Sequence, residues 1–154
     1  MSGPRAGLVA SSLAVVLAGA LAGCSEDRVE AYCEVVAEEQ SALVEAAEDA
    51  EGGGTGTLLA AYDSLERMAD AAPGDVAADW DEVVLRVGAL RDALADAGVD
   101  PATYDPEEPP EGLGADEREA VTAAAVDLVE PTTLRAVQRV EQQVLDVCGA
   151  PLGL

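Results

Sequence analysis

The sequence lacks most of the side chains on which enzymes rely for proton transfer and covalent catalysis. It contains no histidine, and all eight of its basic residues are arginine. Histidine and lysine supply most general bases, amine nucleophiles and nitrogen ligands for metals. We therefore expect no enzymatic activity and no cofactor or metal, although pairs among the 31 acidic residues leave carboxylate-based glycoside chemistry open.

Aromatic residues are also scarce, because the 154 residues include no phenylalanine, one tryptophan and three tyrosines. Apolar residues still make up 49% of the chain, so alanine, valine and leucine must fill the interior. An alanine removes much less apolar surface from water than a phenylalanine does. We expect one domain whose thin core needs additional stabilisation.

Positive charge is in short supply, since 31 acidic residues face eight basic ones and the formal net charge is −23 at pH 7. Proteins bind nucleic acid through cationic groups that replace counterions, and anionic lipid surfaces attract basic segments. This chain therefore fits neither a nucleic-acid partner nor an electrostatic attachment to a membrane.

Residues 1–23 have the pattern of an export signal. Arg5 precedes an apolar run over 8–20, which is too short for an ordinary membrane span, and Leu21-Ala22-Gly23-Cys24 follows. These four residues resemble the lipobox of bacterial lipoproteins. The resemblance implies cleavage before Cys24 and a diacylglycerol, with palmitate-type chains, on its sulfur. Two acyl chains anchor a protein stably, so we expect residues 24–154 on the outer face of the cytoplasmic membrane.

Cys33 and Cys148 remain once Cys24 carries lipid, and the compartment permits disulfides. We expect them to pair. Closing so long a loop stabilises a folded protein by about 4 to 5 kcal/mol in the chain-entropy model. Because Cys33 lies early in the first predicted helix and Cys148 ends the last one, the bond requires these two helices to lie side by side and antiparallel.

Hydrophobic spacing predicts an all-α fold, an up-and-down bundle of four to five helices. Apolar residues recur at three- and four-residue intervals in segments covering about 26–48, 57–72, 76–97, 116–128 and 131–148. Glycines at 52–56, Pro73-Gly74 and Pro131 separate neighbouring segments, and the acidic, proline-rich segment 98–114 is expected to be a long loop.

Two local patterns support the predicted helices. Asp63 and Arg67 have the four-residue spacing of a favourable ion pair on one helix. Asp116 with Glu119 resembles a capping box in which Asp116 is the first cap of the fourth helix.

Gln40 and Glu141 interrupt the apolar faces of the first and last predicted helices. Gln40 lies as far after Cys33 as Glu141 lies before Cys148, so antiparallel helices joined by the disulfide bring them to one level. The predicted aliphatic layer around them consists of Val36, Val44, Val137 and Val144. One interpretation is a buried hydrogen bond that fixes the helix register. The other is a binding pocket lined by both, with Arg91 at its edge.

Two acidic segments are candidates for binding cations. The acids of the loop 98–114 are Asp100, Asp105, Glu107, Glu108 and Glu111. Their oxygens suit Ca²⁺, but they lack the spacing of an EF-hand loop, so a solvated linker is the alternative. Glu30, Glu34 and Glu38 form a ladder of like charges at four-residue spacing. A metal ion or a basic protein face would relieve this repulsion, and a solvated outer face is the other interpretation.

The segment after Cys24 contains a set of short motifs. They are Glu30-Ala31-Tyr32-Cys33-Glu34, Glu38-Glu39-Gln40, Ala72-Pro73-Gly74-Asp75, Gly98-Val99-Asp100-Pro101 with Tyr104-Asp105-Pro106, Glu130-Pro131 and Asp146-Val147-Cys148. Together they resemble a group of alanine-rich lipoproteins of high-GC Gram-positive bacteria over nearly the whole mature length. The resemblance implies a location at the cell envelope. It implies no activity, so no functional residue follows from it.

These observations favour a non-enzymatic envelope module that binds another protein or a small ligand near the membrane. The alternative is a low-affinity binder of divalent cations such as Ca²⁺, built on the acidic loop and the glutamate ladder.

Overall fold

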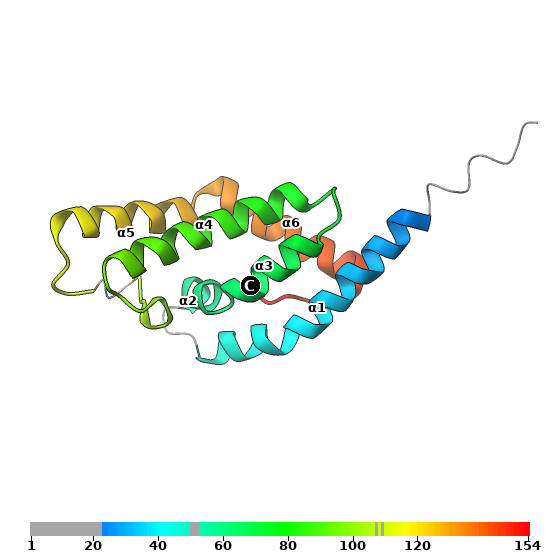
Figure 1. Cartoon of the computed structure of the whole chain (residues 1–154), viewed down its shortest axis with the longest axis horizontal. Helices are drawn as coiled ribbons and strands as arrows, with labels where there is room; N and C mark the ends of the chain where they lie inside the picture. The colour runs from blue at the N-terminus through cyan, green and yellow to red at the C-terminus, as the bar shows by residue number, and fades with distance from the viewer. Residues whose placement is uncertain (1–22, 50–52, 107, 109) are drawn as a thin grey trace, which may run out of the picture.

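The computed structural model describes residues 23–49, 53–106, 108 and 110–154, and this part of the chain is all helical (Figure 1). The described residues form no β-strand, apart from an isolated bridge between Asp105 and Glu108. The elements are α1 (Gly23–Asp49), α2 (Gly53–Ala60), α3 (Tyr62–Ala71), α4 (Ala77–Asp96), the 3₁₀ turn η1 (Pro101–Thr103), α5 (Ala115–Leu128) and α6 (Pro131–Cys148). The predicted all-α fold is confirmed, with six α-helices instead of four to five.

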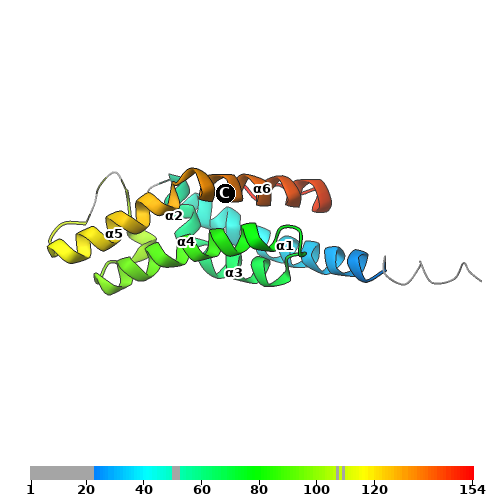
Figure 2. The same ribbon diagram turned by 90° about the horizontal axis from the view of Figure 1, so that it is seen from above.

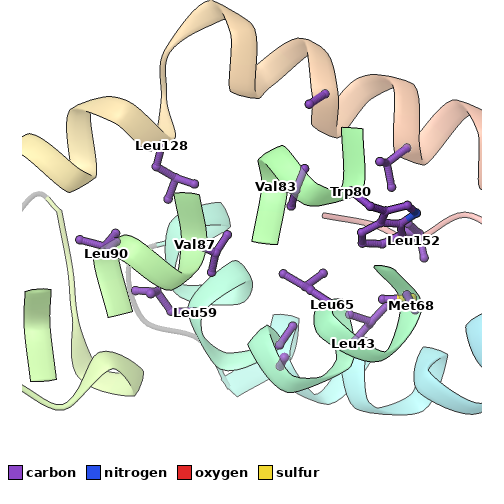
Figure 3. Close-up of a cluster of buried hydrophobic side chains, with 14 of the residues drawn as sticks. Leu43, Leu59, Leu65, Met68, Trp80, Val83, Val87, Leu90, Leu128 and Leu152 are labelled. Atoms are coloured by element: carbon purple, nitrogen blue, oxygen red, sulfur yellow. The ribbon is translucent and has the colours of Figure 1, made fainter. Parts of the chain in front are cut away.

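The single helix expected over 57–72 is wrong, because the chain turns at Ala61 and forms two helices. The Ala61 carbonyl accepts the amides of Ser64 at 2.9 Å and Leu65 at 3.0 Å, which starts α3 in a new direction. Figure 1 shows α2 and α3 pointing in different directions. The turn lets Leu59 of α2 and Leu65 of α3 both enter the core (Figure 3).

The glycines that were expected to separate helices lie largely inside α2, which begins at Gly53. A glycine costs an isolated helix about 1 kcal/mol relative to alanine. The packing of α2 against α1 and η1 offsets this cost. Gly56 and Thr57 are buried, so the small side chains of α2 are accommodated close to its neighbours. Tertiary packing has here outweighed local helix propensity.

Helix α4 is the element around which the others are arranged. It packs against α3 on one side and against α5 and α6 on another, while α1 packs against α2, α3 and α6. Figures 1 and 2 show α5 and α6 following one another along α4. The disulfide-linked helices α1 and α6 thus lie at the outside of this arrangement and close it.

The junction between α5 and α6 is held by a buried hydroxyl. Thr133 is fully buried, and its Oγ1 donates a hydrogen bond to the carbonyl of Asp127 at 3.0 Å. Arg86 of α4 also reaches the Asp127 carboxylate at 3.1 Å. Pro131 is the first residue of α6, as predicted, because its missing N–H would have no helical partner at that position.

The core is centred on the apolar face of α4, which corresponds to the third predicted helix, over 76–97. Its buried residues are Trp80, Val83, Val87, Leu90 and Leu94, at three- and four-residue spacing. Figure 3 shows Trp80, Val83, Val87 and Leu90 facing leucines and a methionine from the other helices. The indole N–H of Trp80 donates to the phenolic oxygen of Tyr32 at 2.8 Å. Burial raises the pKa of Tyr32 to about 12, although the Trp80 hydrogen bond acts in the opposite direction.

The described residues of the segment 98–114 contain no α-helix, and the first part of this segment is ordered by Asp100. The Asp100 carboxylate accepts the amide of Ala102 at 3.0 Å and begins η1. Tyr104 then enters the core and is almost completely buried. Burial raises the pKa of Tyr104, and Asp105 adds to the rise.

Helix α5 does not begin with Asp116 as its cap, so that prediction is wrong. The cap lies two residues earlier, at Gly114, and the Glu117 carboxylate accepts the Gly114 amide at 2.8 Å. Glu117 therefore performs the part expected of Glu119, because it lies three residues after the observed cap.

Candidate functional site

The predicted disulfide forms between Cys33 of α1 and Cys148 of α6. Their Cα atoms lie 5.3 Å apart, and the bond closes a loop between residues that are 115 positions apart. This joins the early part of α1 to the end of α6, as the sequence predicted. Cys24 lies in the first turn of α1, and its lipidation, like the export signal over 1–23, falls on residues whose side chains or backbone lie outside the described part.

Gln40 and Glu141 share no hydrogen bond among the described residues, and each bonds the C-terminal segment instead. The Gln40 amide donates to the carbonyl of Pro151 at 3.1 Å. The Glu141 carboxylate accepts the amide of Leu154 at 3.0 Å. Both side chains are half-buried rather than enclosed in an aliphatic layer. The physical reason is that the C-terminal segment supplies backbone partners to both.

The C-terminal segment is the feature that the helix pattern did not reveal. Helix α6 ends at Cys148, and Gly149, which follows it, has a φ of 70° and turns the chain back toward the middle of the molecule (Figure 1). Leu152 is buried and joins the same core cluster as Trp80 (Figure 3). Residues 150–154 therefore close one side of the bundle.

The predicted layer around Gln40 and Glu141 is only partly present. Val36 and Val144 are buried and Val137 is half-buried, but Val44 is 53% exposed. Arg91 is also elsewhere. Its guanidinium bonds the Asp63 carboxylate at 2.9 Å and lies 4.6 Å from the centre of the Tyr62 ring. Arg91 thus belongs to the α3–α4 surface and not to the Gln40–Glu141 level.

A different polar cluster ties α1 to α3. The Glu39 carboxylate accepts the Ser64 hydroxyl at 2.7 Å and two nitrogens of the Arg67 guanidinium. These hydrogen bonds, Arg67 foremost, hold the pKa of the Glu39 carboxyl below its usual range. Arg67 therefore pairs between helices, and the Asp63–Arg67 pair expected within one helix is replaced by Asp63–Arg91.

A groove of about 950 Å³ lies between α3 and α4. The two helices form a hairpin, with Tyr62 at the start of α3 against Gly88 far along α4. Residues lining the groove are Tyr62, Asp63, Glu66, Arg67, Ala69, Asp70, Asp81, Val84, Leu85, Gly88, Ala89 and Asp92. The lining combines acidic side chains from both helices with small and aliphatic residues.

Gly88 leaves room for the Tyr62 ring beside α4. A Cβ at position 88 would approach the Tyr62 hydroxyl to 2.9 Å. That hydroxyl donates to the Glu66 carboxylate at 3.0 Å. Partial burial raises the pKa of Tyr62, and the bond to Glu66 raises it further.

The charges of this groove are unevenly matched. Asp63 is paired with Arg91, and Arg67 is occupied by Glu39. Asp70, Asp81 and Asp92 take part in no hydrogen bond or ion pair within the described residues. The groove therefore presents unpaired carboxylates on both of its sides.

A second, more apolar groove of about 640 Å³ lies beside the disulfide. It is lined by Glu26, Val29, Glu30, Cys33, Glu34, Ala37, Val147 and Cys148. It lies near the first turn of α1, where Cys24 is placed in the sequence. Two members of the glutamate ladder, Glu30 and Glu34, form part of its rim, and Glu38 is exposed further along α1.

The acidic loop does not gather its carboxylates. Asp100 caps η1, Asp105 and Glu108 form the isolated bridge, and Glu111 is exposed. Glu107 lies outside the described residues. Among the residues that the structure describes, no group of three or more acidic or cysteine side chains is placed to hold a metal ion.

Within the same residues, no helix is both long enough and apolar enough to cross a bilayer. No protein-family model, curated protein or solved structure matches the chain significantly.

Proposed function

We propose that this chain is a non-enzymatic lipoprotein, anchored through Cys24 on the outer face of the cytoplasmic membrane, whose helical domain binds a protein partner. In this proposal residues 1–23 are the cleaved signal peptide, and 24–154 form the anchored up-and-down bundle. The observation that carries the binding function is the α3–α4 groove. It is an open surface lined by small and aliphatic residues and by unpaired carboxylates from both helices.

The scaffold supports a binding role better than a catalytic one. The groove contains no histidine, lysine, serine or thiol, and its one hydroxyl is that of Tyr62. Its tyrosine hydroxyl is engaged by Glu66 and has a raised pKa, which makes it a poor general base at neutral pH. A disulfide across the ends of α1 and α6 holds the frame on which the groove is presented.

The anchoring part is tested by replacing Cys24 with serine in the full chain and fractionating cells. Wild-type protein should sediment with membranes and carry acyl groups on Cys24 by mass spectrometry, because thioether-linked lipid is its attachment. The Cys24→Ser chain should be found in the soluble or secreted fraction with an unchanged fold by circular dichroism. An unmodified N-terminus at a different residue would contradict the proposal.

The binding part is tested by photo-crosslinking in intact cells. A photoreactive residue placed at Leu85, which is 61% exposed in the groove, should capture a protein partner. The same residue placed at Val126, which is 51% exposed on α5, is the matched control. Equal capture from both positions would contradict a specific role for the groove.

A second candidate is low-affinity binding of divalent cations. The observation in its favour is that Glu30, Glu34 and Glu38 are all exposed along α1, where their mutual repulsion is unrelieved. Titration of the protein with millimolar Ca²⁺ should then release heat and raise the melting temperature. Absence of both effects would contradict this candidate.

A further inference from the structure

We infer that the α3–α4 groove is a docking site for a cationic amphipathic helix of a partner protein. This inference rests on the proposed binding function and names the chemistry of its partner. Three independent features of the groove carry it: an unpartnered helix face, small residues in the lining, and unpaired acids on both helices.

The first feature is the missing third helix. Within the described residues, α1 packs on one side of α3, and α5 and α6 pack on α4, but Leu85 in the middle of α4 stays 61% exposed. Two adjacent helices with an open apolar seam present the groove into which the apolar face of an added helix fits. Leu85, Val84 and Ala69 supply that seam from both helices.

The second feature is the small size of several lining side chains, which determines how closely a partner helix can pack. Ala89 on α4 and Ala69 on α3 project only a methyl group into the groove, whereas the space beside Gly88 is filled by the Tyr62 ring. Small residues at a helix interface allow close approach of the partner backbone. The small residues on both helices therefore suit an occupant that packs along them, such as a helix.

The third feature is charge. Asp81 and Asp92 lie on α4 about 16 Å apart, from the 1.5 Å rise of a helix, and Asp70 lies on α3. The arginines of the groove are already matched by Glu39 and Asp63. A helix whose apolar stripe is flanked by lysine or arginine would place cations against the acids of both helices, as flanking charges do in paired helices.

Other occupants fit these features less well. A second copy of the chain would bring the same acidic side chains together, which like-charge repulsion disfavours. A metal ion needs carboxylates gathered at one point, and the described residues contain no such group. A polyamine matches the spread of charge but leaves Leu85 and Ala89 without an apolar partner.

The inference is tested with a designed probe and the full chain carrying Cys24→Ser, so that the outcome does not depend on anchoring. The probe is a three-heptad peptide with alanine and leucine at the seam positions and lysine on both flanks. Binding is measured by fluorescence anisotropy at low and at physiological salt. The comparison probes are a peptide of the same composition with the seam scrambled, a peptide with glutamate flanks, and spermine.

Two triple variants give the matched comparison. The groove variant carries Leu85→Gln, Asp81→Asn and Asp92→Asn. The control variant carries Val126→Gln, Glu45→Gln and Glu119→Gln, which change an equal number of exposed apolar and acidic side chains elsewhere. All six positions are exposed, so both variants should fold. Thermal melts verify this.

The expected result is that the lysine-flanked helix binds, that the groove variant binds it at least tenfold more weakly, and that the control variant stays within twofold of wild type. Affinity should fall as salt is raised. Equal loss in both variants, or equal binding of the scrambled peptide, would show that net charge alone attracts the probe and would overturn the inference. Competition by spermine at the same concentration would overturn it in favour of a polyamine site. Membrane release of Cys24→Ser, measured separately, decides the anchoring proposal whatever the peptide does.

Discussion

The Trp80 indole and the Tyr32 phenol form a hydrogen bond of 2.8 Å in which both side chains are completely buried. This bond joins α4 to α1 at the centre of a core that contains few aromatic rings. Buried polar groups are costly unless they are paired, so each of these two side chains depends on the other.

We predict that Tyr32→Phe lowers the free energy of unfolding by about 1 to 3 kcal/mol, the usual cost of leaving a buried donor unsatisfied. The donor left without a partner is the Trp80 N–H. Urea unfolding followed by Trp80 fluorescence measures the loss. Tyr62→Phe, which removes a hydroxyl from a half-buried position, is the control and should cost less. An equal cost at both positions would contradict a special role for the buried bond.

The raised pKa of Tyr32 leads us to predict a loss of stability at alkaline pH. Burial raises the pKa of Tyr32 from 10.0 to about 12, so the folded protein holds the phenolic proton more tightly than the unfolded chain does. Its contribution to stability is complete below pH 10 and is lost as the pH rises from 10 to about 12.

Urea unfolding at a series of pH values across this window checks the effect. Stability should fall more steeply with pH for the wild-type protein than for Tyr32→Phe, whose position no longer titrates. Tyr62 and Tyr104 also have raised pKa values, so a smaller decline should persist in the variant. Identical slopes for the two proteins would contradict the assignment to Tyr32.

The α4 stripe and the disulfide show which features the sequence makes predictable. Trp80, Val83 and Val87 recur with helical spacing, and a long helix with one apolar face has few alternative placements. Cys33 and Cys148 were the two cysteines left after lipidation was assigned to Cys24. Both inferences depend on local periodicity or on counting, and neither needs knowledge of the tertiary fold.

The features that the sequence did not predict depend on contacts between distant segments. Arg67 pairs with Glu39 on another helix because α1 and α3 lie together, although Asp63 is its neighbour in the sequence. Residues 149–154 have no periodicity, so nothing indicated that Leu152 would enter the core or that this segment would bond Gln40. One weak feature of the sequence pointed to the groove: Leu85 is a large apolar residue that lies off the apolar face of its helix.

The disulfide should contribute a large part of the stability of this domain. The double variant Cys33→Ser with Cys148→Ser should unfold with a free energy about 4 to 5 kcal/mol lower than wild type, because the bond closes a loop of 115 positions. Chemical denaturation of both proteins measures the difference. Thiol labelling of the native exported protein is the independent check, and two reactive cysteines in folded protein would contradict the pairing.

The C-terminal segment should couple Gln40 to Glu141, although the two side chains share no hydrogen bond among the described residues. Gln40→Ala and Glu141→Ala each remove one bond to this segment and should each cost about 0.5 to 1.5 kcal/mol. In a chain that ends at residue 149, both partners are absent, and the same two substitutions should become nearly neutral. Chemical denaturation of each substitution, in the full chain and in the truncated chain, measures the four costs against the matching parent protein. Costs that persist after truncation would show that the side chains act through other contacts.

The last prediction concerns Gly88 and Tyr62, which lie against each other in the lining of the groove. Replacing a helical glycine by alanine ordinarily gains about 0.5 to 1 kcal/mol. Here a Cβ at position 88 would approach the Tyr62 hydroxyl to 2.9 Å, so the ring must move and its bond to Glu66 is disturbed. Gly88→Ala alone should therefore gain little or lose stability.

In a Tyr62→Phe background the closest atom is absent, and Gly88→Ala should recover most of the ordinary gain. The difference between the two backgrounds, measured by urea unfolding as a double-mutant cycle, is expected to be about 0.5 to 1 kcal/mol. Ala89→Gly, the reverse change at the neighbouring exposed position of α4, is the control and should cost about the same in both backgrounds. A coupling energy of zero would mean that the Tyr62 ring moves away at no cost. The close contact with Tyr62 would then not be the reason for a glycine at position 88.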